Sequence, residues 1–343
     1  MEKKQNTENT GKTELTENTG KQYRFDITAI GEVLIDFTWE GADEGSRYPV
    51  LKAHPGGAPA NFLAAAAVLG ARTAFIGKVG NDAFGKLLVE TLKEHGINTD
   101  CVYVTDEAFT TMAFVTLDEH GDREFSFARK PGADTLLAAE DVPYDVIAGS
   151  KILHYGSLLM TGRTGYEATM TAISCAKDAG TVCSYDPNYR KPLWKSEDEA
   201  VKMMLEGFGK ADVVKISDEE AELLFGLTGD EALRYMTSRF GTRLVMLTKG
   251  PKGADIMHDG KIVSVKAPAV KPVDTTGAGD ICGGSLAAGL LALPGFTPRD
   301  FLSGRRVLTE EELLKIGKYA VYAASRSTEK PGGITSIERV TVD

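Results

Sequence analysis

The stretch DTTGAGD, from Asp274 to Asp280, places a carboxylate at each end of a glycine-rich turn. The turn runs directly into ICGGSLAAGLLAL, whose small and apolar residues predict a helix. The backbone N–H groups of Gly277, Ala278 and Gly279 would therefore lie at a helix N-terminus, where the positive end of the helix dipole stabilises an anion. Such a turn could hold a phosphoryl group during its transfer. It is not a P-loop, because the sequence contains no GxxxxGK[ST].

Asp280 has two interpretations at this position. An acidic side chain in the first turn of a helix commonly stabilises the helix N-terminus. A carboxylate beside an anion hole could instead be a general base that takes the proton of a hydroxyl attacking the phosphoryl group. The turn by itself leaves both interpretations open.

The elements that must position this turn alternate between strand and helix patterns. FDITAIG, from Phe25, and TAFIGKVG, from Thr73, predict strands. Helical patterns follow each of them, PANFLAAAAVLG from Pro59 and NDAFGKLLVETLKEHGIN from Asn81. This alternation predicts an α/β fold in which helices cover both faces of a mostly parallel sheet.

Two segments interrupt the alternation. TTMAFVTLDEHGDREFSFA reads as a hairpin around the His120, Gly121 and Asp122 turn, and EVLIDFTWEG continues past its strand into an extended polar stretch. Together they predict a small sheet set apart from the main one, which could cover a cleft and exclude water. The alternative is a plain antiparallel edge of the main sheet.

Four segments of the second half begin apolar and end in a polar or glycine-rich cluster: TVCSYDPNYR, ADVVKISDEE, RLVMLTKGPKG and VDTTGAGD. We interpret each cluster as the end of a strand. Ligands of open α/β sheets bind outside the carboxyl ends of the strands, so the four clusters predict one shared site.

The composition excludes several classes of function. The 343 residues are 42% hydrophobic and 26% charged, which is typical of a globular protein. A net charge of −10 and a pI of about 5.2 argue against a nucleic-acid partner. No apolar run approaches the roughly 18 residues of a membrane span, and the N-terminus does not resemble a signal peptide. The four cysteines form no CxxC pair, which favours the cytoplasm.

The N-terminal residues 1–24 differ from the rest of the chain. They repeat TENTGK at Thr7 and Thr16 and contain almost no apolar side chains. We expect this tail to be disordered, because it cannot bury enough surface to offset its ordering entropy. Residues 25–343 are expected to form one domain.

Five motifs occur in the order and spacing of the ribokinase-like sugar kinase family: GEVLIDF, GGAPAN, DPNYR, LTKGPKGA and DTTGAGD. The chain resembles this family over about residues 25–340. The resemblance implies a three-layer α/β sandwich with a mostly parallel central sheet and a small β-sheet lid, formed by about residues 36–52 and 109–130.

Within the family the chain is most similar to fructokinases, in the stretches HYGSLLM, DPNYRKPLW and KISDEEAELL. The resemblance implies ATP-dependent phosphorylation of the 6-hydroxyl of D-fructose with Mg²⁺. It also implies a homodimer formed through the lid and, as in some members, a K⁺ site.

The resemblance implies a role for each residue that matches a family motif. Asp280 matches the catalytic base, and Gly277, Ala278 and Gly279 match the anion hole. The positions that match sugar ligands are Asp36, Gly56, Gly57, Asn61, Arg129 and Arg190. Carboxylate and amide groups can hold vicinal hydroxyls by paired hydrogen bonds. Without the resemblance, Asp36 and Gly57 read equally well as turn residues and Asn61 as a helix cap.

The nucleotide and metal positions follow in the same way. The residues that match the nucleotide site are Asn188, Thr248, Gly250, Gly253, Gly277 and Gly279, and Asp274 and Thr276 match the monovalent-cation loop. Glu220 matches the acid that orders magnesium-bound water in an Asn-x-x-Glu motif. Here Ser217 replaces the Asn, and SDEE is also a capping box, so a purely structural role is open.

Three alternatives accompany this reading. Ribose is disfavoured because Ala58 replaces the lysine of ribokinases, whereas 2-keto-3-deoxygluconate remains, since Arg129 or Lys130 could bind its carboxylate. A catalytically silent sugar-binding protein is a second alternative, although the chain keeps Asp280 and the glycines of the turn. A dehydrogenase is disfavoured because no GxGxxG follows the first strand.

Overall fold

The computed structural model describes residues 22–42, 48–117 and 123–340. Its centre is a nine-stranded sheet in the order β13-β12-β11-β10-β9-β8-β1-β4-β5. The pairs from β11 to β5 are parallel, and β12 and β13 add an antiparallel edge. The strands are β1 Phe25–Ile30, β4 Thr73–Gly80, β5 Ile97–Thr105, β8 Ser150–Gly156, β9 Val182–Asp186, β10 Val213–Ser217, β11 Leu244–Thr248, β12 Ala254–His258 and β13 Lys261–Val265.

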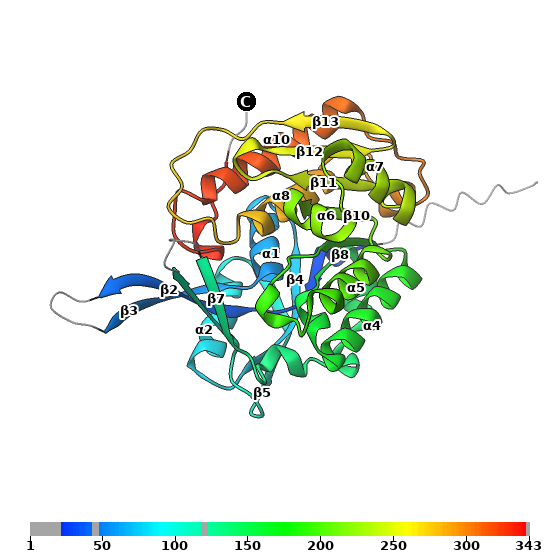
Figure 1. Cartoon of the computed structure of the whole chain (residues 1–343). Helices are drawn as coiled ribbons and strands as arrows, with labels where there is room; N and C mark the ends of the chain where they lie inside the picture. The colour runs from blue at the N-terminus through cyan, green and yellow to red at the C-terminus, as the bar shows by residue number, and fades with distance from the viewer. Residues whose placement is uncertain (1–21, 43–47, 118–122, 341–343) are drawn as a thin grey trace, which may run out of the picture.

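Helices cover both faces of this sheet, so the molecule has three layers (Figure 1). One face is covered by α1 Ala58–Val68, α2 Ala83–Glu94, α8 Ala278–Leu291, α9 Pro298–Leu302 and α10 Glu310–Ser327. The other face is covered by α3 Tyr144–Ala148, α4 Arg163–Ala179, α5 Glu197–Phe208, α6 Asp218–Phe225 and α7 Gly229–Phe240.

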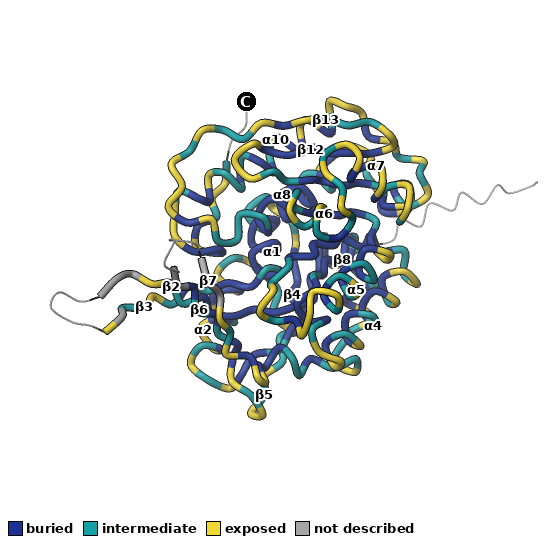
Figure 2. Tube along the Cα trace, in the orientation of Figure 1, coloured by how far each residue is buried: buried dark blue, intermediate teal, exposed yellow. Residues whose placement is uncertain are grey.

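Successive residues of the central strands supply the two cores. In β11, Leu244 and Met246 face one cluster of helices, while Val245 and Leu247 face the other. This follows from the two-residue period of a strand and explains why these segments are apolar throughout. Figure 2 shows the same result as a buried centre under a partly exposed shell of helices.

A separate four-stranded sheet has the order β3-β2-β6-β7. Its strands are β2 Leu34–Ala42, β3 Pro49–Gly56, β6 Met112–Leu117 and β7 Arg123–Ala128. The β6–β7 pair is antiparallel, as predicted for this hairpin, whereas the turn at 118–122 lies outside the described residues. The small sheet expected from the sequence is therefore present, and we call it the lid sheet.

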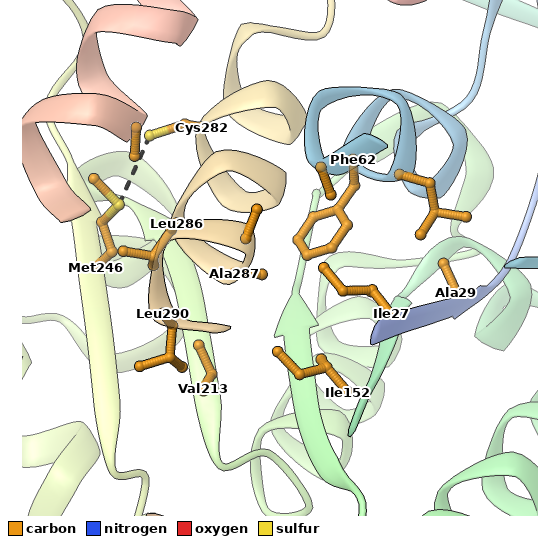
Figure 3. Close-up of a cluster of buried hydrophobic side chains, with 14 of the residues drawn as sticks. Ile27, Ala29, Phe62, Ile152, Val213, Met246, Cys282, Leu286, Ala287 and Leu290 are labelled. Carbon is orange, nitrogen blue, oxygen red and sulfur yellow. Dashed lines mark hydrogen bonds between the residues drawn. The ribbon is translucent and has the colours of Figure 1, made fainter. Parts of the chain in front are cut away.

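Helices α1 and α8 pack unusually closely because their contact is lined by small residues. A Cβ added at Gly284 of α8 would lie 2.0 Å from the backbone oxygen of Phe62 in α1. The Phe62 ring itself is buried, lies beside Ile27 of β1 (Figure 3) and stacks on the His154 ring of β8 with a centroid distance of 3.6 Å. Burying a side chain of this size contributes about 1.5–3 kcal/mol. This contact fixes the N-terminus of α8 beside the N-terminus of α1.

One element prediction is wrong. The structure has no strand immediately before DTTGAGD, because the described residues 266–277 are an irregular segment that leads into α8. The other three clusters do follow strands, namely β9, β10 and β11. Most of the tail predicted to be disordered, residues 1–21, lies outside the described residues. Within the described ranges no helix is both long and apolar enough to cross a membrane.

Candidate active site

A polar cavity of about 580 Å³ opens where the carboxyl ends of the strands meet the lid sheet. It is lined by Leu34 and Asp36 of β2, by Phe127 of β7, by the segment after β9, and by the N-termini of α1, α6 and α8. These segments are far apart in the sequence. Only the α/β crossover connections bring them to one edge of the sheet.

Asp280 lies in the first turn of α8 and is 7% exposed. Asn61 Nδ2 donates a hydrogen bond of 2.9 Å to Asp280 Oδ2, and Asn188 Nδ2 donates one of 3.0 Å to Asp280 Oδ1. Burial raises the pKa of Asp280, and the Asn61 hydrogen bond and the Lys215 and Arg190 charges oppose that rise. Both oxygens keep a further lone pair, so the carboxylate is oriented and can still accept a proton.

The turn before Asp280 presents backbone donors. Gly277 has φ 75°, a left-handed conformation that favours glycine, and a Cβ there would also lie 2.9 Å from Asn61 Nδ2. The N–H of Ala278 has a long hydrogen bond of 3.3 Å to the Thr275 carbonyl. The N–H groups of Gly277 and Gly279 have no acceptor within the described part of the chain. The turn can therefore bind an anion mainly through these two glycines.

Asp36 occupies the lid side of the cavity. It is 8% exposed, and no hydrogen bond to its side chain is formed within the described residues. Burial raises the pKa of Asp36 to about 7, the Arg190 charge opposes that rise, and Asp280 and Asp274 add to it. A buried carboxylate without a protein donor suits a ligand that donates hydroxyl hydrogen bonds.

Two glycines, Gly56 at the end of β3 and Gly57 before α1, leave room for Asp36 and for the backbone beside it. A Cβ at Gly56 would lie 2.1 Å from Asp36 Oδ2, so only glycine leaves room for the carboxylate. Gly57 has φ 107°, and a Cβ there would lie 2.6 Å from the Glu32 carbonyl oxygen. Glu32 is itself buried, and its Oε1 accepts a hydrogen bond of 3.0 Å from the Ala58 N–H. These contacts hold the N-terminus of α1, and with it Asn61, against the cavity.

Lys215 supplies a cation behind the anion-binding turn. Its Nζ lies 3.1 Å from Asp186 Oδ2, and a Cβ added at Gly279 would lie 2.7 Å from that Nζ. The carboxylates of Asp186, Glu220 and Asp280 raise the pKa of Lys215 although burial lowers it. Burial raises the pKa of Asp186, and the charge of Lys215 opposes that rise. Lys215 therefore stays charged next to the place where a transferred anion would sit.

Glu220 is both a cap and a wall of the cavity. Its Oε2 accepts from the Ser217 N–H at 3.0 Å, and its Oε1 accepts from the Tyr189 N–H at 2.8 Å. The Ser217 hydroxyl completes the predicted capping box by accepting from the Glu220 N–H at 3.1 Å. Arg190 and Asn188 line the same cavity, and Asn188 is held at φ 49°.

A second, mostly apolar cavity of about 680 Å³ adjoins the first. Thr248, Gly250 and Gly253 line it, together with apolar residues of the 267–272 segment, α8 and α10. Gly253 has φ 101°, and a Cβ there would lie 1.9 Å from the Val265 oxygen. Gly279 lines both cavities. A flat apolar ring with a phosphate tail could thus lie here and end at the turn.

Asp274 organises the loop that precedes the turn. Its Oδ1 accepts hydrogen bonds from the N–H and hydroxyl of Thr276, at 2.9 and 2.7 Å, and its Oδ2 accepts from the Gly332 N–H at 2.8 Å. The carboxylate therefore shapes the loop as a structural anchor.

The chain matches, over residues 24–339, a protein-family model described as pfkB family carbohydrate kinase. The chain belongs to this family of carbohydrate kinases. The kinase is 38% identical over 319 residues to fructokinase-2 of Oryza sativa subsp. japonica, with 92% of each chain covered.

Solved structures agree with this assignment. Fructokinase from Xylella fastidiosa superposes with a TM-score of 0.83 at 27% identity, covering 91% of this chain and 94% of that one. Fructokinase from Vibrio cholerae O395 superposes with a TM-score of 0.79 at 32% identity, covering 91% and 96%. The ribokinase-like fold expected from the sequence is thereby confirmed.

Asp36, Gly57, Asn61 and Arg190 line the polar cavity as expected for sugar ligands, whereas Gly56 and Arg129 line neither cavity. Arg129 is 8% exposed, and its guanidinium pairs with Asp134 at 2.6 Å. It also donates to Thr161 Oγ1 at 2.8 Å and to the Leu158 carbonyl at 3.0 Å. The neighbouring Lys130 is exposed. These hydrogen bonds tie Arg129 to the protein interior beneath the lid sheet.

Sequence reasoning missed three residues of this site: Lys215, Asp186 and Glu32. Lys215 could have been found, because a lysine between Val214 and Ile216 in a buried parallel strand is unusual and calls for a partner. Asp186 carried no comparable signal, since the end of a strand is an ordinary place for an aspartate.

Proposed function

We propose that this kinase transfers the γ-phosphoryl group of ATP to the 6-hydroxyl of D-fructose, giving fructose 6-phosphate and ADP. The observation that carries the proposal is the position of the Gly277–Asp280 turn. Gly279 lines both the polar and the apolar cavity, and Asp280 projects from the same turn into the polar one. The Vibrio cholerae structure holds fructose, ADP and a calcium ion, and the Xylella fastidiosa structure holds ATP, which supports a sugar and an adenine nucleotide as the ligands of this kinase.

In the proposed reaction Asp280 accepts the proton of the 6-hydroxyl while that oxygen forms a bond to the γ-phosphorus. The bond from the γ-phosphorus to the β,γ-bridging oxygen breaks, and ADP leaves with the electron pair. The raised pKa of Asp280 makes it a stronger base than an exposed aspartate. The N–H groups of Gly277 and Gly279 and the Lys215 ammonium stabilise the charge on the migrating group.

Sugar binding is assigned to the lid side. Asp36 and Asn61 would accept and donate hydrogen bonds to the sugar hydroxyls, with Gly56 and Gly57 leaving the space they need. Asn61 Oδ1 is buried and has no hydrogen-bond partner in the described part of the chain, so it is available to a ligand hydroxyl. Closure of the lid sheet over the sugar would exclude water from the phosphoryl group.

The residues present fit a magnesium ion that is bound mainly by the phosphates of ATP. Such an ion would neutralise part of the phosphate charge. Among the residues described, no group of three or more His, Cys, Asp or Glu could hold a metal. Mg²⁺ bound to phosphates needs few protein ligands, and Glu220 would contact it through water. We assign K⁺ to the loop shaped by Asp274 and Thr276; a variant of the Vibrio cholerae enzyme was solved with potassium.

A keto-acid substrate is less well supported. Its carboxylate requires a cation, and Arg129 is already paired with Asp134 while Lys130 is exposed. Arg190 lines the cavity, but it faces the carboxylates of Asp36 and Asp280. A neutral ketose matches this balance of charge better.

The test is a coupled ADP-release assay with MgATP and, in turn, D-fructose, 2-keto-3-deoxygluconate and D-ribose. Turnover with fructose alone is expected. Turnover with the keto acid instead would transfer the substrate assignment to that acid. No turnover, combined with thermal stabilisation by fructose, would refute catalysis and leave a silent sugar-binding protein.

We also propose that two copies associate through their lid sheets. Trp39 is 48% exposed and Leu51 is 37% exposed, and they are direct cross-strand partners on the β2–β3 hairpin that extends from the body in Figure 1. Covering such a pair favours association. Sedimentation analysis should give a dimer that Trp39→Ser converts to monomer; an unchanged mass for this variant would contradict the assignment.

A further inference from the structure

A third cavity, of about 220 Å³, lies at the end of the sheet opposite the active site. It is enclosed by the turn after α7, by the β12–β13 turn and by residues 304–307. Strand β11 starts beside this cavity at Leu244 and ends at Thr248 in the wall of the apolar cavity. The third cavity therefore shares no wall with the reaction described above.

Several buried polar atoms in the walls of this cavity have no hydrogen-bond partner among the described residues. Within the described residues, eight buried side-chain nitrogen or oxygen atoms have no hydrogen bond. Three of the eight belong to residues that line this one cavity: Thr242 Oγ1, His258 Nε2 and Arg306 Nε. Thr242 is 3% exposed and His258 is 2% exposed. Buried polar atoms are nearly always paired in proteins, so this concentration indicates a polar occupant.

The protonation of His258 defines what that occupant must offer. Its Nδ1 lies 2.8 Å from the Arg243 carbonyl oxygen, which can only accept, so Nδ1 carries the hydrogen. Burial lowers the pKa of His258, as do the Arg243 and Lys261 charges, while the Arg243 hydrogen bond and the Asp259 charge raise it. The ring is therefore neutral near pH 7, and Nε2 is an acceptor that requires a donor from the occupant.

Cationic groups supply the rest of the wall. The Arg243 guanidinium lies against Gly304, where an added Cβ would be 3.1 Å from Nη1, and it forms no ion pair within the described part of the chain. Arg306 pairs with Glu312 through Nη2 and donates from Nη1 to the Val307 carbonyl at 3.0 Å, so its Nε remains. An exposed carboxylate, Asp259, is also present at the rim.

We propose that this cavity is a binding site for inorganic phosphate. The phosphate oxygens accept hydrogen bonds from Arg243, from Arg306 Nε and from the Thr242 hydroxyl, while a P–OH donates to His258 Nε2. Arginine is suited to this task because its fork binds phosphate oxygens in pairs. Inorganic phosphate keeps at least one hydroxyl near neutral pH, whereas sulfate has none. The site is thus built to prefer phosphate over sulfate.

The experiment titrates the purified kinase with inorganic phosphate by calorimetry and thermal shift, and compares four proteins. Relative to wild type, Arg243→Gln should weaken the binding at this site about tenfold or more, since it removes a charge-assisted pair of hydrogen bonds. Arg305→Gln is the control: that arginine lies in the 304–307 segment but does not line the cavity, is 59% exposed and pairs with Asp300, so binding should change less than about twofold.

Thr242→Val is the second variant, and it is nearly isosteric. Because the Thr242 hydroxyl has no hydrogen-bond partner among the residues that the structure describes, the valine variant should melt at the same or a higher temperature without phosphate. It should nevertheless gain less stabilisation from phosphate than wild type. A variant that is at least as stable as wild type without phosphate, but is stabilised less by phosphate, has lost ligand binding and not its fold.

Three results would overturn the proposal. One is equal phosphate affinity in wild type, Arg243→Gln and Thr242→Val, which would confine phosphate to the turn at Gly277–Asp280. Another is equal affinity for sulfate, or tighter binding of glycerol 3-phosphate, which would remove the assigned role of the P–OH. The third is no binding up to about 50 mM phosphate, which would leave a water-filled cavity.

Discussion

Replacing Asp280 by Asn tests the proposed base with the smallest change in shape. The side-chain amides of Asn61 and Asn188 each donate a hydrogen bond to the Asp280 carboxylate, at 2.9 and 3.0 Å. The new amide would place a donor opposite one of them. Asn61 can accommodate it, because its Oδ1 is buried without a hydrogen-bond partner among the described residues and a rotation of its amide would present that acceptor. We therefore expect Asp280→Asn to fold.

The expected loss is in turnover. A positioned general base contributes about 10²–10⁴-fold, so kcat should fall by that factor while the KM values for ATP and fructose change little. The same substitution should leave the stability of the fold unchanged or increase it. The pKa of Asp280 is raised by burial, so its ionised form costs stability, and this cost grows as pH rises from the unfolded toward the folded pKa. The variant should therefore melt at the same or a higher temperature at alkaline pH, and the gain should shrink in acid.

The assay is ADP release under saturating substrates, with thermal melting at several pH values. Asp300→Asn is the chemically matched control, because Asp300 is a surface carboxylate paired with Arg305 and should leave kcat within about twofold. Near-normal turnover of Asp280→Asn, in a protein that melts as expected, would refute the assignment of Asp280 as the base.

Three further predictions follow from the same geometry. Asp36→Asn should raise the fructose KM about tenfold, and the wild-type KM should fall as pH rises through about 7, where Asp36 ionises; a KM independent of pH would contradict this. Lys215→Met should shift the acidic limb of the kcat/KM profile to higher pH, because the Lys215 charge lowers the pKa of Asp280, and Lys215→Arg should restore the limb. Gly284→Ala should lower both kcat and the melting temperature, since a Cβ 2.0 Å from the Phe62 oxygen overpacks the α1–α8 contact by about 1–3 kcal/mol; an unchanged melting temperature would count against that contact.

Much of the fold could be predicted because its signals are local. The alternation of strand and helix patterns gave a sheet covered on both faces, and residues 112–117 and 123–128 form the hairpin that their two-residue alternation predicted. The segment before DTTGAGD was the exception. Its valine and aspartate resembled the end of a strand, but an apolar residue next to a turn does not by itself provide a neighbouring strand to pair with.

The site was predictable only where a residue type carries its own chemistry. A glycine-rich turn before a helix binds anions through backbone groups, so the Gly277–Asp280 turn was visible in the sequence. The cation behind it, Lys215, could have been suspected as a lysine within a buried strand, but the sequence did not show which residues are its partners. The role of Lys215 depends on Asp186 and Gly279, which reach it from β9 and α8.

The sequence by itself determined the order of the elements, the turn that faces an anion and the family to which the chain belongs, because periodicity, capping and glycine conformations act over a few residues. Only the tertiary structure decided which side chains share a cavity. Asn61 and Asp280 meet across 219 residues because glycines let α1 and α8 approach closely, and Arg129 is paired inside the protein because Asp134 lies beside it. Burial and pairing are set by contacts between distant segments, and no local pattern encodes the distance at which two elements pack.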